Sequence, residues 1–136
     1  MHKRVIAGLA LAISLTSGAA GAEFDSLRAT LGEMTYKRSC VTCHGTSGQG
    51  EAEAGSQAVP APDLTLLERR NGANFPTERV TEIIAGGASV TVHGGQMPAW
   101  DLIFKDSGGQ DAAATDATAE RRIGDLVEYL RKIQLP

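Results

Sequence analysis

The segment Cys40-Val41-Thr42-Cys43-His44 is the feature that most constrains the fold of this 136-residue chain. Its order, C-x-x-C-H, is the one used for covalent attachment of haem c. In such sites the two thiols bond to the vinyl groups of one porphyrin, and the histidine that follows lies below the iron. We therefore predict one haem c, held covalently by Cys40 and Cys43, with His44 as an axial iron ligand.

Two other kinds of site contain a C-x-x-C pair. A structural zinc site needs further Cys or His ligands, but Cys40 and Cys43 are the only cysteines in the chain. A thioredoxin-like dithiol needs a βαβ setting, and no strand pattern follows the motif. The surroundings of the motif therefore favour haem attachment.

The first 22 residues have the pattern of a secretory signal peptide. A positive start at residues 2–4 leads into an apolar run at residues 5–15, and Ala20-Gly21-Ala22 matches an A-x-A cleavage site. A retained membrane anchor is the alternative, but a membrane span needs about 20 apolar residues. We expect cleavage near Ala22, a periplasmic protein without a membrane span, and one domain over residues 23–136. Export agrees with the motif, because bacteria attach haem c outside the cytoplasm.

Composition and charge limit the classes of partner. Only 4% of the residues are aromatic, which is lean for a chain of this size, and a buried porphyrin would add apolar core. Without Lys3 and Arg4, 11 basic and 16 acidic side chains remain. An acidic balance argues against nucleic acid as a partner. It fits either a docking partner of opposite charge or simple solubility.

The apolar spacing predicts an all-α chain. Gly32, Tyr36 and Cys40 recur every four residues and so share one face of a helix that leads into the motif. Glycine within a helix costs about 1 kcal/mol relative to alanine, so we expect a second helix to cross closely at Gly32. We predict that this partner is the C-terminal helix and that Tyr129 lies near Tyr36. The expected helices run from about residue 26 into the motif, and over 65–70, 76–86 and about 118–134.

Two segments between these helices lack a sustained apolar period. Residues 45–59 are rich in Gly, Ser, Ala and Glu, and we expect them to form a loop over the haem edge. Residues 106–118 contain few large apolar side chains and are expected to form an exposed, mobile connection.

Met97 is the predicted second axial ligand of the iron. The turn Gly94-Gly95 allows the backbone to come close to a porphyrin, and Pro98 stiffens the chain after Met97. A thioether ligand would raise the reduction potential. His93 is the rival ligand and would lower that potential.

Other side chains near this stretch have less specific roles. Trp100 is expected either to lie against the haem and donate its indole proton to a propionate or to be an ordinary core residue. Arg69 and Arg79 could also meet propionates, although a solvated helix face explains them equally well.

Taken together, these residues resemble those of the class I cytochromes c, in particular the small bacterial monohaem ones. The resemblance covers nearly the whole chain after residue 22, and its motifs are Gly32-x-x-x-Tyr36, Cys40-x-x-Cys43-His44, Pro62-x-Leu64, Met97-Pro98-x-Trp100 and the helix containing Tyr129. It implies the cytochrome c fold, with four to five short helices around one haem. It also implies that the carbonyl of Pro62 accepts the ring proton of His44 and that Leu64 packs on the porphyrin. The long loop before Pro62 and the insert before the last helix depart from the better-known members and leave the redox partners open.

The predicted function is one-electron transfer rather than catalysis. With both axial positions filled by His44 and Met97, the iron has no position for a substrate. The protein would serve as a soluble carrier, or as the haem subunit of a complex with a dehydrogenase or a terminal oxidase. The alternative, motivated by the flexible Gly94-Gly95 turn beside Met97, is a haem with a labile distal site that binds a small gas or reduces peroxide.

Overall fold

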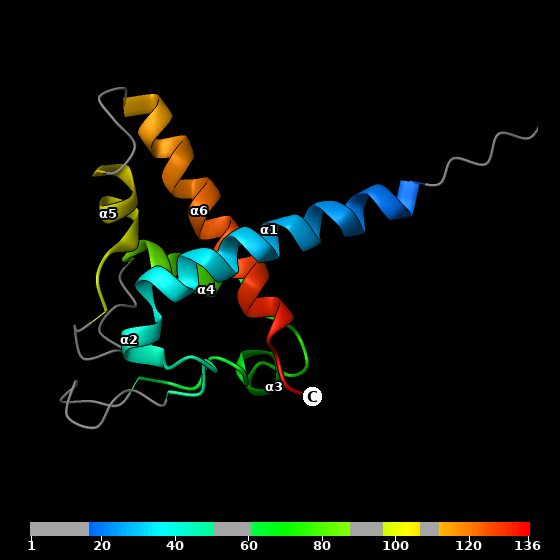
Figure 1. Cartoon of the computed structure of the whole chain (residues 1–136). Coiled ribbons are helices and arrows are strands. Elements are labelled where there is room, and N and C mark those ends of the chain that lie inside the picture. Colours follow the sequence, from blue (N-terminus) through cyan, green and yellow to red (C-terminus); the bar gives the residue numbers. More distant parts are fainter. Residues whose placement is uncertain (1–16, 51–60, 88–96, 107–111) are drawn as a thin grey trace, which may run out of the picture.

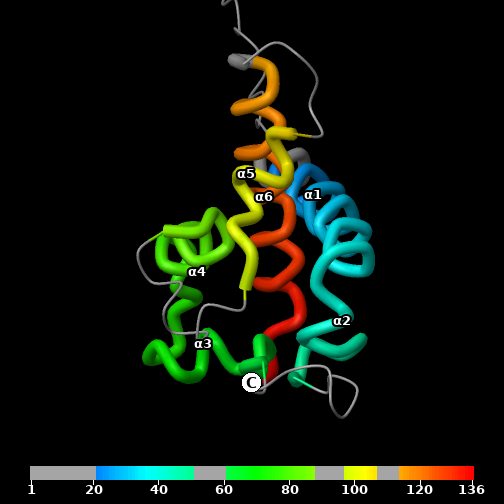
Figure 2. Tube along the Cα trace, turned by 90° about the vertical axis from the view of Figure 1, so that its left-hand side faces the viewer, coloured from blue at the N-terminus to red at the C-terminus, as the bar shows by residue number. Residues whose placement is uncertain are grey.

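The computed structural model describes residues 17–50, 61–87, 97–106 and 112–136, and all regular structure in these ranges is helical. The six helices are α1 (Ser17–Ser39), α2 (Val41–His44), α3 (Leu67–Arg70), α4 (Thr77–Ala85), α5 (Trp100–Asp106) and α6 (Ala112–Lys132). The two long helices, α1 and α6, cross each other, and the first half of α1 extends away from the body (Figure 1). Seen from the side, α1 and α2 flank α6 on one side and α3 and α4 on the other (Figure 2). The all-α prediction is confirmed.

The crossing of α1 and α6 depends on Gly32. A Cβ atom at this position would lie 2.6 Å from the carbonyl carbon of Asp125 and 2.8 Å from Cβ of Tyr129, so only glycine allows the backbones to come this close. One turn later, the rings of Tyr36 and Tyr129 lie 5.2 Å apart with an interplanar angle of 46°. The predicted crossing at Gly32 and the predicted proximity of the two tyrosines are therefore confirmed.

An ion pair lies beside this crossing. Arg28 Nε donates a hydrogen bond of 2.9 Å to Oδ1 of Asp125, whose side chain is only 8% exposed. A carboxylate buried to this extent needs a charged partner or several donors. Arg28 therefore compensates a group that would otherwise oppose the packing of the two helices.

The core is built on one face of α6. Its apolar side chains are spaced by three and four residues, as an amphipathic helix requires, and the buried ones are Ala119, Ile123, Leu126, Val127 and Leu130. Full burial of a large apolar side chain contributes roughly 1.5–3 kcal/mol. The face of α6 that carries these residues contacts α1, α4 and α5.

The end of α4 is fixed by two glycines. Gly86 has a φ angle of 95° in the left-handed region, and the N–H groups of Gly86 and Gly87 bond to the carbonyls of Ile83 and Glu82 at 3.2 and 2.9 Å. This is a glycine C-cap of the kind expected at such a sequence. Val80 and Ile84 are buried on the inner face of α4, as the spacing predicted.

Several element boundaries differ from the predictions. Helix α1 begins at Ser17 rather than near Ser26, and α6 begins at Ala112 rather than near Thr118. The expectation of an exposed connection over 106–118 is thus wrong for its second half, because the alanines that lack apolar bulk are also the strongest helix formers. Helix α5 was not predicted. Residues 51–59 of the expected loop lie outside the described residues.

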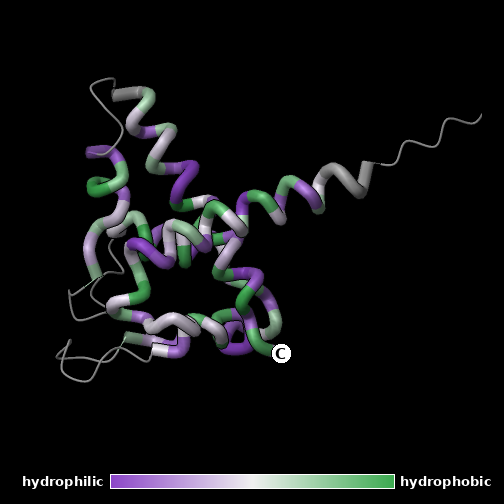
Figure 3. Tube along the Cα trace, viewed as in Figure 1, coloured by the Kyte–Doolittle hydropathy of each residue, from purple (hydrophilic) through white to green (hydrophobic). Residues whose placement is uncertain are grey.

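Phe24, Leu27, Leu31 and Met34 recur at helical intervals along α1, but all four are exposed. The face of α1 that packs on α6 is instead the row of Gly32 and Tyr36. Apolar positions continue along the part of α1 that extends beyond the body (Figure 3). Among the described residues, no helix is long and apolar enough to cross a membrane.

Candidate functional site

The C-x-x-C-H residues lie on a helical turn that continues from α1 into α2. The N–H of Cys40 bonds to the carbonyl of Tyr36 at 2.8 Å, and the N–H of His44 bonds to the carbonyl of Cys40 at 2.9 Å. In a helix, residues at i, i+3 and i+4 share one face. Cys40 and His44 both line the cavity described below, whereas Cys43 is half-buried on the same turn and does not line it. Cys40 and His44 are 8% and 6% exposed.

His44 is oriented by the loop that carries Pro62. Its Nδ1 lies 3.2 Å from the carbonyl oxygen of Pro62, which can only accept. The proton of the neutral ring is therefore on Nδ1, and the lone pair that can bind a metal is on Nε2. This contact is the one that the family resemblance implied.

The Pro62 loop is in turn held by the C-terminus. The side-chain amide of Gln134 donates to the carbonyl of Leu64 at 2.8 Å and accepts from the N–H of Glu68 at 2.9 Å. The N–H of Leu135 donates to the carbonyl of Thr65 at 2.8 Å. These bonds tether Leu64, Thr65 and Glu68 to the C-terminus. They thereby hold the nearby Pro62 carbonyl in position beside His44.

Beside His44 is a cavity of about 400 Å³. This volume falls in the range of roughly 300–1,000 Å³ that is usual for small-molecule and cofactor sites. Its walls are mainly aliphatic and come from the Pro62 loop, α3, α4 and α6, and they include Leu64, Leu67, Val80, Ile84, Leu126 and Leu130. Such a cavity suits a large, flat and largely apolar group.

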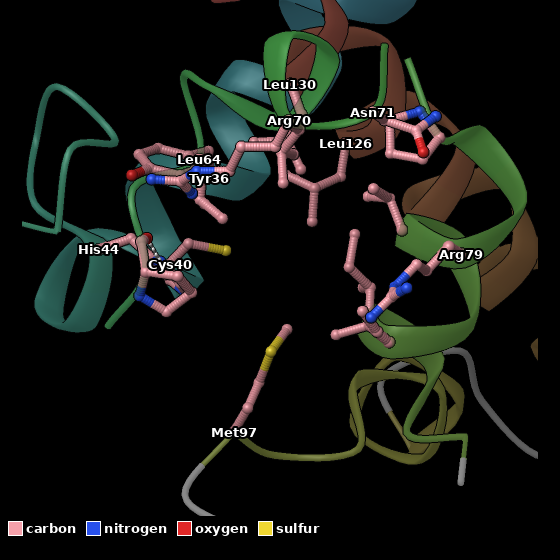
Figure 4. Close-up of a pocket in the computed structure, with 16 residues that line it drawn as sticks. Tyr36, Cys40, His44, Leu64, Arg70, Asn71, Arg79, Met97, Leu126 and Leu130 are labelled. Atoms are coloured by element: carbon pink, nitrogen blue, oxygen red, sulfur yellow. Dashed lines mark hydrogen bonds between the residues drawn. The ribbon is translucent and has the colours of Figure 1, made fainter. Parts of the chain in front are cut away.

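Several polar and sulfur-containing side chains reach this cavity. His44 and Cys40 lie on one side, and the thioether of Met97 extends into it from the loop before α5 (Figure 4). Arg79 lies on the α4 side, while Arg70 and Asn71 stand at the end of α3. An imidazole, a thioether and a thiol around an apolar space, with guanidinium groups at its border, match the donor set of a haem c and its two carboxylates. The residues present therefore fit this cofactor.

The other predicted site residues are placed as follows. Pro62 and Leu64 line the cavity. Trp100 begins α5, does not line the cavity, and has its ring centroid 5.5 Å from that of Phe104. His93, the rival ligand, lies outside the described residues.

Sequence reasoning missed two of the cavity-lining residues, Arg70 and Asn71. It named Arg69 and Arg79, of which only Arg79 lines the cavity. In a helix of four residues, neighbouring arginines point in different directions, and the choice between them depends on how α3 is attached to the rest of the chain. The sequence showed that two arginines end this helix, but it did not show which of them faces the cavity.

The environment of Cys40 disfavours a redox dithiol. Burial, followed by the nearby Cys43, raises the pKa of the Cys40 thiol to about 12. Reactive cysteines of dithiol oxidoreductases have lowered pKa values, roughly 3.5–7.5, because the thiolate is the nucleophile. A thiol that stays protonated near neutral pH does not suit that chemistry.

Tyr36 anchors the residue that follows His44. Its hydroxyl donates a buried hydrogen bond of 2.7 Å to the carbonyl of Gly45. Burial, followed by Cys40 and Tyr129, raises the pKa of this hydroxyl well above its ordinary value. Tyr36 therefore remains a neutral donor throughout the pH range in which the protein would work.

We expect Tyr36→Phe to lower the free energy of unfolding of the holoprotein by about 1–2 kcal/mol, since a hydrogen bond between buried groups is lost while the ring is kept. Chemical denaturation followed by circular dichroism measures this change. Tyr129→Phe is the matched control, because the described residues show no hydrogen bond from its hydroxyl, and it should change stability by less than about 0.5 kcal/mol. Equal losses in the two variants would contradict the role given to the Tyr36 hydroxyl.

Comparison with known proteins agrees with this site. Residues 28–115 match the family described as cytochrome c oxidase, cbb3-type, subunit III. A similar protein is the cbb3-type cytochrome c oxidase subunit CcoP of Azospirillum sp. (strain B510), which is 30% identical over 87 residues. The match covers 64% of this chain but only 27% of that protein. No solved structure matches the chain. Since the family match takes in well over half of the residues, including the C-x-x-C-H turn and the stretch around Met97, the chain belongs to this family and is a c-type cytochrome, a haem protein of electron transport.

Proposed function

We propose that this protein transfers single electrons through one haem c that is bonded to Cys40 and Cys43 and ligated by His44 and Met97. The observation that carries the proposal is the cavity of about 400 Å³ into which His44 and Met97 both extend. When bound, haem c supplies reversible Fe(III)/Fe(II) chemistry. The family to which the chain belongs supports this choice of cofactor.

Each side chain has a definite task in this proposal. The Pro62 carbonyl keeps the proton of His44 on Nδ1, so that Nε2 can bind a metal and the ring cannot rotate freely. Met97 supplies a soft thioether, a ligand that favours the reduced state and raises the reduction potential. If His44 and Met97 both bind the iron, no position on it would remain for a substrate.

The residues that line the cavity also suit a haem of raised reduction potential. Aliphatic side chains such as Leu64, Leu126 and Leu130 exclude water and keep the local dielectric constant low, which also raises the reduction potential. Arg70 and Arg79 would hold the propionates, because guanidinium groups pair with carboxylates in a planar, bidentate manner. These side chains would fix the orientation of the cofactor in the cavity.

The test is the near-infrared spectrum of the oxidised holoprotein, where an iron–methionine bond gives a weak band. We expect this band in the wild type and its loss in Met97→Ala, together with a fall of the reduction potential by a measurable part of the roughly 0.8 V span that axial ligands set. Met34→Ala is the matched control, because Met34 is 59% exposed on α1 and lies away from the cavity.

The other outcome is equally informative. If the wild type lacks the band, Met97 is not the ligand, and either His93 or an open distal site takes its place. Rapid binding of CO by the reduced protein would then separate an open site, suited to gas binding or peroxide reduction, from ligation by a second histidine.

We further propose that the chain is exported, is cleaved after Ala22 and works with a respiratory oxidase, as a soluble carrier or as a haem-carrying part of the complex. The similar protein is named as a subunit of such an oxidase, but the chain spans about a quarter of its length. The intact mass of periplasmic protein tests the cleavage, since a chain that starts at Glu23 has a defined mass. Stoichiometric co-purification of partner subunits would favour the complex over the free carrier.

A further inference from the structure

Helix α1 carries a row of four large apolar side chains that the haem site does not use. Phe24, Leu27, Leu31 and Met34 are 60%, 57%, 43% and 59% exposed, and none of them lines the cavity beside His44. We call these four residues the α1 seam. Single exposed apolar residues are ordinary, but a contiguous row of them marks an interaction surface.

The spacing of the α1 seam indicates what kind of partner it fits. Its residues follow one another at intervals of three, four and three, which are the a and d positions of a heptad repeat. An a/d row packs lengthwise against another helix. The seam also lies on a different face of α1 from Gly32, which contacts α6, so the second helix can lie along α1 while α6 stays in place.

Charge along α1 selects the direction of that second helix. Glu23 and Asp25 lie at the start of the seam, and Lys37 and Arg38 follow its end. Two copies of α1 that run antiparallel bring each acidic end next to a basic end. A parallel pair would instead place like charges side by side, which is unfavourable.

A groove next to the seam provides room for such a partner. It has a volume of about 290 Å³ and is lined by residues of α1, α5 and α6, among them Leu31, Met34, Arg38, Phe104 and Arg122. The guanidinium carbon of Arg122 lies 5.6 Å from the ring centroid of Phe104. The lining is mixed, since Leu31, Met34 and Phe104 are apolar and the other lining residues, Thr35, Arg38, Ser39 and Arg122, are polar or charged. Such a groove suits an apolar side chain next to a carboxylate, which is the order of Glu23 and Phe24.

We propose that the α1 seam binds the α1 seam of a second copy of this chain, antiparallel and about a two-fold axis. Phe24 of each copy would lie opposite Met34 of the other, and Leu27 opposite Leu31. Such an isologous contact is closed, so association stops at the dimer. All of these residues follow Ala22, so cleavage at that position leaves the surface in place.

This dimer is a weak one. A seam of four residues buries less than the roughly 800 Å² per partner that a standard stable interface contains. Monomer and dimer should therefore exchange within the working range of protein concentration. The proposal stands apart from the electron-transfer function, since it uses no residue of the haem site.

Sedimentation equilibrium of the purified holoprotein tests the proposal between about 1 μM and 1 mM, the range in which weak complexes form. We expect wild type to shift from monomer to dimer and Leu31→Glu to remain monomeric. Leu102→Glu is the control, because Leu102 is 66% exposed on α5 and belongs neither to the seam nor to the lining of the groove, and it should dimerise like wild type. Unchanged haem absorption and circular dichroism confirm that each variant is folded.

Charge reversal tests the antiparallel register. Glu23→Lys and Lys37→Glu should each weaken the dimer at low salt, and the combined variant should recover most of the loss. A wild type that stays monomeric at the highest concentration overturns the proposal, as does a dimer that Leu31→Glu leaves intact. Binding of a monomeric wild type to anionic phospholipid vesicles, lost in Leu31→Glu, would also overturn it and assign the seam to a membrane surface.

Discussion

Replacing both Cys40 and Cys43 by serine is expected to yield a protein that carries no covalent haem and does not fold stably. The expected readout is the loss of colour after acid-acetone extraction, which removes only haem that is not covalently bound. Thr42→Ala, which changes the exposed residue between the two cysteines, should keep its colour and serves as the control for export and expression.

The instability follows from the size of the cavity beside His44. A cavity closed to solvent destabilises a protein by about 24 cal/mol per Å³, so a closed volume near 400 Å³ would cost roughly 10 kcal/mol. That upper bound is comparable to the entire free energy of unfolding of a domain, about 5–15 kcal/mol. The cavity beside His44 is partly open, so without a group between them we expect the walls supplied by α3, α4 and α6 to collapse or to admit water.

We therefore expect the serine variant to retain helical far-ultraviolet circular dichroism, to lose the near-ultraviolet signal and to bind a hydrophobic dye, as molten globules do. Calorimetry should show no cooperative unfolding transition. If a haem-free variant unfolded as cooperatively as the holoprotein, the cofactor would not stabilise the protein by filling the cavity.

Gly32→Ala is expected to lower the free energy of unfolding by about 2 kcal/mol, the upper end of an overpacking cost less the gain in helix propensity. The added Cβ would meet the backbone carbonyl of Asp125 and, at 2.8 Å, Cβ of Tyr129. Neither neighbour can move without shifting α6, and overpacking of this kind typically costs about 1–3 kcal/mol, occasionally more. The gain in helix propensity, about 1 kcal/mol, offsets only part of this cost. Chemical denaturation of the holoprotein measures the difference.

Gly124→Ala is the matched control at the same crossing. A Cβ at this position would meet only the Nη2 end of the Arg28 guanidinium, which can shift aside while Nε keeps its hydrogen bond to Asp125. We expect its stability to lie within about 1 kcal/mol of wild type. Equal stability of the two alanine variants would show that the crossing of α1 and α6 does not require glycine at position 32.

The sequence predicted those features that depend on local spacing. The C-x-x-C-H order places three chemical groups on one helical turn, and the apolar periods of α4 and α6 indicate which side chains face inward. The glycines after Ile84 predicted the end of α4 because a left-handed residue is needed there. Gly32 also predicted a distant contact, since an unfavourable residue within a helix needs a reason in the packing.

Prediction failed where helix propensity and apolar spacing disagreed, or where the outcome depended on residues far away in the chain. The start of α6 at Ala112 was missed because alanine has high helix propensity but little apolar bulk. The large apolar side chains of α1 were by themselves misleading, since they are exposed, and only Gly32 indicated the row that faces α6. Which row faces α6 depends on Asp125 and Tyr129, almost a hundred residues away.

By itself, the sequence predicted the order of chemical groups on the C-x-x-C-H turn, the all-helical class and the inward faces of α4 and α6. These properties depend on residues within a few turns of one another, whose relative positions the helix geometry sets. Only the tertiary structure decided that Arg70 and Asn71, rather than Arg69, line the cavity of His44, and that the α1 seam stays exposed. Such contacts join segments separated by long stretches of chain, and their relative positions depend on how the helices pack.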